Sequence, residues 1–168
     1  MFQDEARIGQ KGRVCRRWFT RGKRPPGVID QRYTFAYLYG CADVETDRAF
    51  ALVLPEVNTQ SMQVFIDKFA ETIRPDEHVA MFIDGAGWHG AIDLKFPDTI
   101  TPFRLPATSP EVNPMERIWE HLKERYLSQR LLDDYEAIVD ATCAAWNKLV
   151  ADPGRIASLT WTPWRQAA

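Results

Sequence analysis

The feature that most constrains the fold is a short apolar run, Val79–Ile83, which ends directly in Asp84 and is followed by Gly85-Ala86-Gly87. Such a run predicts a buried strand, and open α/β sheets bind ligands at the carboxyl ends of their strands. A second carboxylate, Glu116, follows after 31 intervening residues in the first turn of an expected helix, and a third is available at Asp4. Clustered carboxylates repel unless a cation lies between them, so the pattern indicates a divalent metal and phosphodiester chemistry.

Apolar periodicity along the rest of the chain predicts an α/β domain with a mixed central sheet flanked by helices. The strands expected beside Val79–Ile83 cover residues 33–42, 48–54 and 100–105. The expected helices cover residues 58–73, 87–95, 114–127 and 133–150. There is no internal repeat, and we expect residues 1–168 to form a single domain.

Two of the carboxylates also have an ordinary structural interpretation. Asp84 can simply close a turn. Glu116 falls at the third helical position after Asn113, from which it can reach back to the Asn113 backbone N–H in a capping box. The apolar stripe of this helix includes Trp119. Glu116 lies about 110° from the centre of that stripe, at its edge, from which it can reach a cleft beside the sheet. Glu120, one turn further along, is a rival candidate, and the local pattern leaves these alternatives open.

Positive charge is concentrated near the start of the chain, although the formal net charge is −2. Residues 1–32 hold nine Lys or Arg against three Asp or Glu, with Trp18 and Phe19 interleaved. Such a segment can bind a phosphate backbone, and it can equally be a solvated arm. Residues 5–32 are expected to be irregular or to form a hairpin. The candidates for phosphate-backbone contacts are Arg13, Arg16, Arg17, Arg21, Lys23 and Arg24.

Several other classes of site are excluded by the sequence. It contains no Ser/His/Asp nucleophile pattern, no Gly-rich phosphate loop and no Cys/His metal cluster. His89 can orient a phosphate, a water or a carboxylate, but a lone His is more often a partly buried surface residue. The three cysteines are widely spaced and odd in number, which favours a reducing cytoplasm. No apolar run approaches the ~20 residues that cross a membrane.

Three stretches resemble the catalytic domain of DDE transposases, in particular the bacterial insertion-sequence relatives of the mariner superfamily. They are FQDEARIG (2–9), FIDGAGWH (82–89) and LPATSPEVNPMERIWEHLK (105–123). The resemblance implies an RNase H-like fold with the first Asp on the central strand, the second on the fourth strand and the Glu on a following helix. These residues would be Asp4, Asp84 and Glu116, with His89 and Asn113 as auxiliary candidates.

The resemblance also implies a reaction. The three carboxylates would hold two Mg²⁺ (or Mn²⁺) ions that activate water for attack on a DNA phosphate. The freed 3′-OH would then attack target DNA, so the expected activity is strand cleavage and strand transfer at transposon ends by a homodimer. Two alternatives stay open, a non-catalytic DNA-binding remnant and an RNase H-like nuclease that acts on another substrate.

The chain departs from the family pattern at its start. Family members carry helix-turn-helix DNA-binding domains upstream of the catalytic domain, whereas this sequence begins three residues before Asp4. We therefore expect a catalytic half in which the first strand is truncated and the upstream domains are absent. The interval between Asp84 and Glu116 is also a few residues shorter than is usual in this branch.

Overall fold

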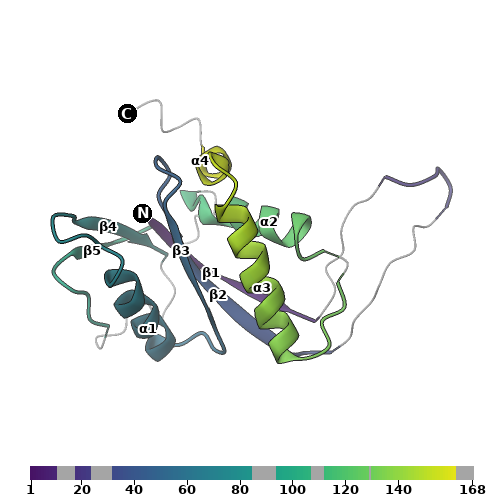
Figure 1. Cartoon of the computed structure of the whole chain (residues 1–168), viewed down its shortest axis with the longest axis horizontal. Helices are drawn as coiled ribbons and strands as arrows, with labels where there is room; N and C mark the ends of the chain where they lie inside the picture. The colour runs from purple at the N-terminus through teal and green to yellow at the C-terminus, as the bar shows by residue number, and fades with distance from the viewer. Residues whose placement is uncertain (11–17, 24–31, 85–93, 107–111, 129, 162–168) are drawn as a thin grey trace.

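The computed structural model describes residues 1–10, 18–23, 32–84, 94–106, 112–128 and 130–161. Its strands are β1 (Phe2–Gly9), β2 (Phe35–Ala42), β3 (Ala49–Leu54), β4 (Val79–Ile83) and β5 (Ile100–Arg104). Its helices are α1 (Thr59–Ala70), α2 (Met115–Arg125), α3 (Tyr135–Val150) and α4 (Arg155–Thr160). Figure 1 shows one sheet with helices packed beside it, which confirms the α/β prediction.

The sheet is mixed and has β1 at its centre. The strand order is β3-β2-β1-β4-β5. The pairs β1–β2 and β2–β3 are antiparallel, whereas β1–β4 and β4–β5 are parallel. One hydrophobic cluster joins β1, β2 and β3 to α2, α3 and α4, and the other joins α1 to β2, β4 and β5. The helices therefore cover both faces of the sheet, and α3 runs alongside β1 and β2 in Figure 1.

The face on which Asp4 lies follows from the alternation of side chains along β1. Ala6 and Ile8 are buried in the cluster formed with α2 and α3, and Phe2 packs against that cluster. Asp4 has the same parity as these three residues, and its partner in β2 is Gly40. Asp4 therefore lies on the face of the sheet that α2 and α3 cover.

β1 is longer than expected from the sequence. Its eight residues all pair with β2, and Phe2 also pairs with Phe82 in β4. The expectation of a truncated first strand is corrected, because residues 5–9, which were expected in an irregular or hairpin segment, belong to β1. The positive charge of this segment had argued against a buried strand here. The Arg7 guanidinium lies 4.5 Å from the centroid of the Phe35 ring, where a cation–π contact accommodates it beside the strand.

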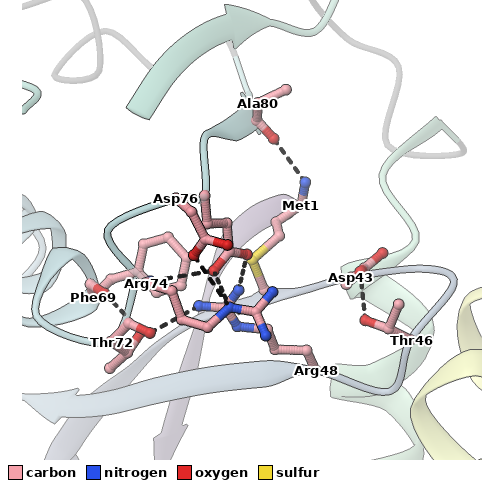
Figure 2. A network of polar contacts seen from close by, with 10 residues as sticks. Met1, Asp43, Thr46, Arg48, Phe69, Thr72, Arg74, Asp76 and Ala80 are labelled. Carbon is pink, nitrogen blue, oxygen red and sulfur yellow. Dashed lines mark hydrogen bonds and ion pairs between the residues drawn. The ribbon is translucent and has the colours of Figure 1, made fainter. Parts of the chain in front are cut away.

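The start of β1 is fixed against β4 by backbone contacts. The Met1 amino nitrogen donates to the Ala80 carbonyl at 2.7 Å, and the Phe82 N–H donates to the Met1 carbonyl at 2.8 Å. Figure 2 shows the Met1–Ala80 contact beside a polar cluster around Arg48. Arg48 pairs with Glu77 and donates to the Thr72 carbonyl, so it ties β3 to the segment that precedes β4.

Most of the other predicted elements are confirmed, with ends that differ by a few residues. β4 has the predicted bounds, and Asn58 caps α1 by accepting from the Ser61 N–H at 2.8 Å. The helix expected over 87–95 falls mostly outside the described residues. The short helix α4 was not predicted. None of the described helices is long and apolar enough to cross a membrane.

Candidate active site

Asp4 is a buried carboxylate in the central strand. It is the third residue of β1, and only 8% of its surface is exposed. The indole Nε1–H of Trp119, on α2, donates to Asp4 Oδ2 at 2.9 Å. A buried carboxylate is unfavourable unless it is hydrogen-bonded or paired, so this contact with α2 is one reason why the strand tolerates an acid here.

The surroundings of Asp4 change its acidity. Burial raises its pKa to about 7, and the neighbouring charges of Glu5 and Glu116 act in the same direction. The Trp119 hydrogen bond opposes the rise because it stabilises the charged form. Asp4 is therefore partly protonated near neutral pH, and a cation beside it would favour the ionised form.

Asp84 lies level with Asp4 by strand register. Phe2 and Phe82 are partners in the parallel pair β1–β4, and their rings stack with centroids 4.9 Å apart on the same side of the sheet. Asp4 and Asp84 each follow two residues later, and Asp84 comes directly after the last residue of β4. Neighbouring strands lie about 4.8 Å apart. The register thus directs both aspartates to one end and one face of the sheet.

Glu116 lies in the first turn of α2 and is exposed. Its charge contributes to the raised pKa of Asp4, so the two carboxylates interact across the gap between α2 and β1. The reciprocal contact of a capping box is not observed between Glu116 and Asn113, both of which the structure describes. Instead, Asn113 Oδ1 accepts from the Met115 N–H at 3.1 Å. Negative charge in a first helical turn is also favourable because of the helix dipole.

The three carboxylates fit a hard divalent cation in chemistry, but the structure does not gather them around one point. Carboxylate oxygens are the donors that Mg²⁺ prefers. Among the described residues, however, no three His, Cys, Asp or Glu side chains are close enough to hold one metal ion. The Glu116 charge makes the smallest contribution to the raised pKa of Asp4, and strand register places Asp84 level with Asp4. Because carboxylates repel one another, the three side chains need a neutralising cation between them in order to come together at one point.

Two contributors to the site were not predicted in these roles. Trp119 was predicted only as part of the apolar stripe of its helix, yet it donates to Asp4. Asn113, predicted as a helix cap and an auxiliary site residue, also donates from Nδ2 to the Gln3 carbonyl at 3.2 Å. Gln3 is fully buried beside Asp4, and its Oε1 has no hydrogen-bond partner among the described residues. The indole N–H of Trp119 is a polar group on an otherwise apolar helical stripe, and this was the signal that could have indicated a buried hydrogen-bond acceptor.

The remaining candidates lie mostly outside the described residues. This holds for His89, and also for Arg13, Arg16, Arg17 and Arg24. Arg21 and Lys23 fall in the described segment 18–23, where both are exposed. Trp18 is fully exposed and Phe19 half-exposed in the same segment. This segment therefore presents aromatic and basic side chains to solvent.

A family model described as DDE superfamily endonuclease matches residues 1–139, which include Asp4, Asp84 and Glu116. The chain belongs to the DDE superfamily of endonucleases. This chain is also 38% identical over 130 residues to a protein of Sinorhizobium fredii (strain NBRC 101917 / NGR234), described as uncharacterized protein y4pE/y4sA. That match covers 77% of this chain and 96% of the relative.

Solved structures of Mos1 share the fold of this chain. The Mos1 mariner paired end complex with Mn matches with a TM-score of 0.69 at 16% identity, covering 95% of this chain and 50% of that chain. The Mos1 strand transfer complex matches with a TM-score of 0.67 at 16% identity, covering 95% and 49%. The predicted RNase H-like fold is thereby confirmed. The chain spans about half the length of these Mos1 chains.

Proposed function

We propose that this chain is the catalytic domain of a transposase that cleaves DNA strands at transposon ends and transfers them to target DNA, with Asp4, Asp84 and Glu116 as metal ligands. The observation that supports this most is the arrangement around Asp4. A buried acid on the central strand interacts with Glu116 on α2, and the parallel register sets Asp84 level with it. Membership of the DDE superfamily and the fold shared with the Mos1 paired end complexes with Mn and with Mg support the same proposal.

The protein's own residues supply binding and orientation. Asp4 is held by β1 and by Trp119, whereas Glu116 lies on a helix that packs on the same strand. The three carboxylates would hold two Mg²⁺ or Mn²⁺ ions. Bound metal would lower the pKa of the attacking water and stabilise the leaving 3′ oxygen. The side chains would fix the positions of these ligands, so no covalent protein–DNA intermediate is required.

The substrate in this proposal is DNA, bound through its phosphates by the basic segment near the start of the chain. Arg21 and Lys23 are exposed there beside Trp18. Basic side chains neutralise backbone phosphates, and exposed aromatic rings stack on bases. We further propose that the chain acts as a homodimer in the bacterial cytoplasm, and that a separate DNA-binding domain recognises the transposon ends.

The proposal is tested by divalent-dependent nicking of a transposon-end duplex. Nicking should require Mg²⁺ or Mn²⁺ and should fall to background in Asp84→Asn, which keeps the shape of the side chain but removes its charge. Glu120→Gln is the matched control, because Glu120 is an exposed carboxylate one turn beyond Glu116 on the same helix. Full activity of Asp84→Asn, or equal loss in both variants, would refute the proposed roles.

One observation favours the alternative of a non-catalytic DNA-binding remnant. No three described carboxylates, histidines or cysteines lie within reach of one ion. The two readings differ in how Mn²⁺ affects thermal stability, because an ion that binds only the folded state raises its melting temperature. A clear rise in the wild-type chain that is absent from Asp84→Asn supports the enzyme. No rise in either protein supports the remnant.

A further inference from the structure

Two side chains tie α2 to the central strand, and they lie on either side of Glu116. Asn113 precedes Glu116 by three residues and Trp119 follows it by three. Asn113 contacts the backbone of Gln3, and Trp119 contacts the side chain of Asp4. Consecutive residues of β1 are thus bonded to positions before and after the candidate ligand on the helix.

The Trp119 contact is built into the core around it. Trp119 is almost fully buried and packs against Trp146 with ring centroids 6.1 Å apart. Gly40, the β2 partner of Asp4, leaves room for the indole, since a Cβ at Gly40 would lie 2.5 Å from the ring atom Cη2 of Trp119. The ring is therefore confined on two sides, and its N–H meets one particular oxygen, Asp4 Oδ2, at 2.9 Å.

The Asn113 contact uses both ends of one amide. Its Nδ2 donates to the Gln3 carbonyl, and its Oδ1 accepts from the Met115 N–H at the start of α2. Both bonds are buried, and the side chain is only 6% exposed. One side chain thus links the first turn of the helix to the backbone beside Asp4. α1, in contrast, is capped by Asn58 through a contact within its own start.

We propose that Asn113 and Trp119 are positioning residues that clamp α2 onto β1 and so fix the position of Glu116 relative to Asp4, the two carboxylates that would bind a divalent metal. The inference rests on the proposed function, because it takes both carboxylates as metal ligands. Partners that orient metal ligands by hydrogen bonds affect metal affinity strongly, and losing one lowers affinity about 10–100-fold. A residue that only fills the core affects stability and leaves metal affinity unchanged.

The test is calorimetric titration of the full chain with Mn²⁺, using variants and matched controls. Trp119→Phe keeps an aromatic ring but removes the N–H donor, and Trp161→Phe makes the same change at a half-exposed tryptophan outside the clamp. Asn113→Ala removes the shared amide, and Asn58→Ala removes a cap of similar size from α1. We expect Trp119→Phe and Asn113→Ala to bind Mn²⁺ about 10–100-fold more weakly. The two controls should stay within about twofold of the wild-type chain, because they leave the clamp intact.

A metal-free readout tests the Trp119 contact itself. The chain has six tryptophans, so the indole N–H signal of Trp119 in a ¹⁵N spectrum is the one that Trp119→Phe removes. That signal should shift in Asp4→Asn, which changes the acceptor, and stay in place in Glu120→Gln. If the Trp119 signal does not shift in Asp4→Asn, the hydrogen bond between Trp119 and Asp4 is wrong.

The outcomes separate the clamp from the proposed function. If wild-type protein binds Mn²⁺ and both clamp variants bind as tightly as their controls, the clamp is wrong and the metal site stands. If wild-type protein binds no Mn²⁺, the proposed function fails and the clamp fails with it. If Trp119→Phe does not fold, as judged by circular dichroism, Asn113→Ala decides, since it removes only a small side chain.

Discussion

α1 and α2 pack on opposite faces of the same sheet, but they are attached to it in different ways. α1 buries Met62, Phe65, Ile66 and Phe69, and its start is capped by its own Asn58. α2 also buries an apolar stripe, yet it adds hydrogen bonds to β1 through Asn113 and Trp119. Apolar packing tolerates small shifts, whereas directed hydrogen bonds specify one position. α1 is also hydrogen-bonded to the sheet, between Ser61 and Tyr39, but the bonds of α2 reach the candidate ligand Asp4 and the residue beside it. We therefore expect changes on the α1 side to affect stability and changes on the α2 side to affect the candidate site.

The largest expected effect on stability is on the α1 side. Phe65 is fully buried and its ring packs near Tyr39, Phe50 and Phe69. Phe65→Ala should destabilise the protein by about 3–5 kcal/mol, because it removes apolar contacts and leaves a cavity. Urea unfolding measures this loss. The Mn²⁺ affinity of the remaining folded protein should be unchanged. If metal binding is also lost, α1 does more than stabilise the fold and the contrast with α2 is wrong.

On the α2 side, removing the buried acid should stabilise the fold. Burial raises the folded-state pKa of Asp4 from its usual value of 3.8 to about 7, so the folded protein holds this proton more tightly than the unfolded chain. Stability should therefore fall as pH rises from about 4 to about 7, and change no further above that. Asp4→Asn should abolish this fall and be more stable at pH 8 by on the order of 4 kcal/mol.

Denaturant unfolding of both proteins between pH 4 and pH 8 checks this prediction. Asp84→Asn is the control, because it removes a carboxylate that is less buried than Asp4. Its stability should change with pH as that of the wild-type protein does. If the stability of wild type and of Asp4→Asn depends on pH in the same way, Asp4 is not buried in solution as it is in the structure.

How far the sequence could predict the molecule differs between these regions. β4 and the start of α1 were predicted because their signals are local, namely an apolar run between turns and, at Asn58 or Thr59, a side chain that can cap the periodic stretch after it. Residues 5–9 were assigned to an irregular or hairpin segment and not to the first strand, because their pairing with β2, which outweighs the charge of Arg7, is not visible in the local pattern. Periodicity placed Trp119 on the buried face, but it cannot show that an indole N–H meets a carboxylate 115 positions earlier.

A smaller effect is expected at Gly40, which gives the Trp119 ring its space. A Cβ there would lie 2.5 Å from Trp119 Cη2 and 3.2 Å from Met115 Cε. Gly40→Ala should cost about 1–3 kcal/mol through overpacking, and it should also move the Trp119 indole N–H signal. Thermal unfolding and the ¹⁵N spectrum measure the two effects. A stable variant with an unshifted signal would show that the ring is not confined.

The smallest expected effect concerns α4, which the sequence did not predict. Asp47, in the turn between β2 and β3, accepts from the N–H groups of Gly154 and Ala157 at the start of this helix. Asp47→Ala should destabilise the protein by about 1 kcal/mol, as the loss of a helix cap does. Asp47→Asn should retain part of that stability because one acceptor oxygen remains. Equal melting temperatures for Asp47→Ala and wild type would show that the cap is unimportant.

The most direct test of the central claim is the position of Mn²⁺ in crystals of the full chain, located by its anomalous scattering. Asp4, Asp84 and Glu116 should surround the Mn²⁺ signal, with Asp4 Oδ2 still bonded to the Trp119 indole. Crystals of Glu120→Gln should give the same signal, and crystals of Asp84→Asn should lose it. An Mn²⁺ signal elsewhere, or none at saturating Mn²⁺, would contradict the assignment of these three carboxylates as the metal site.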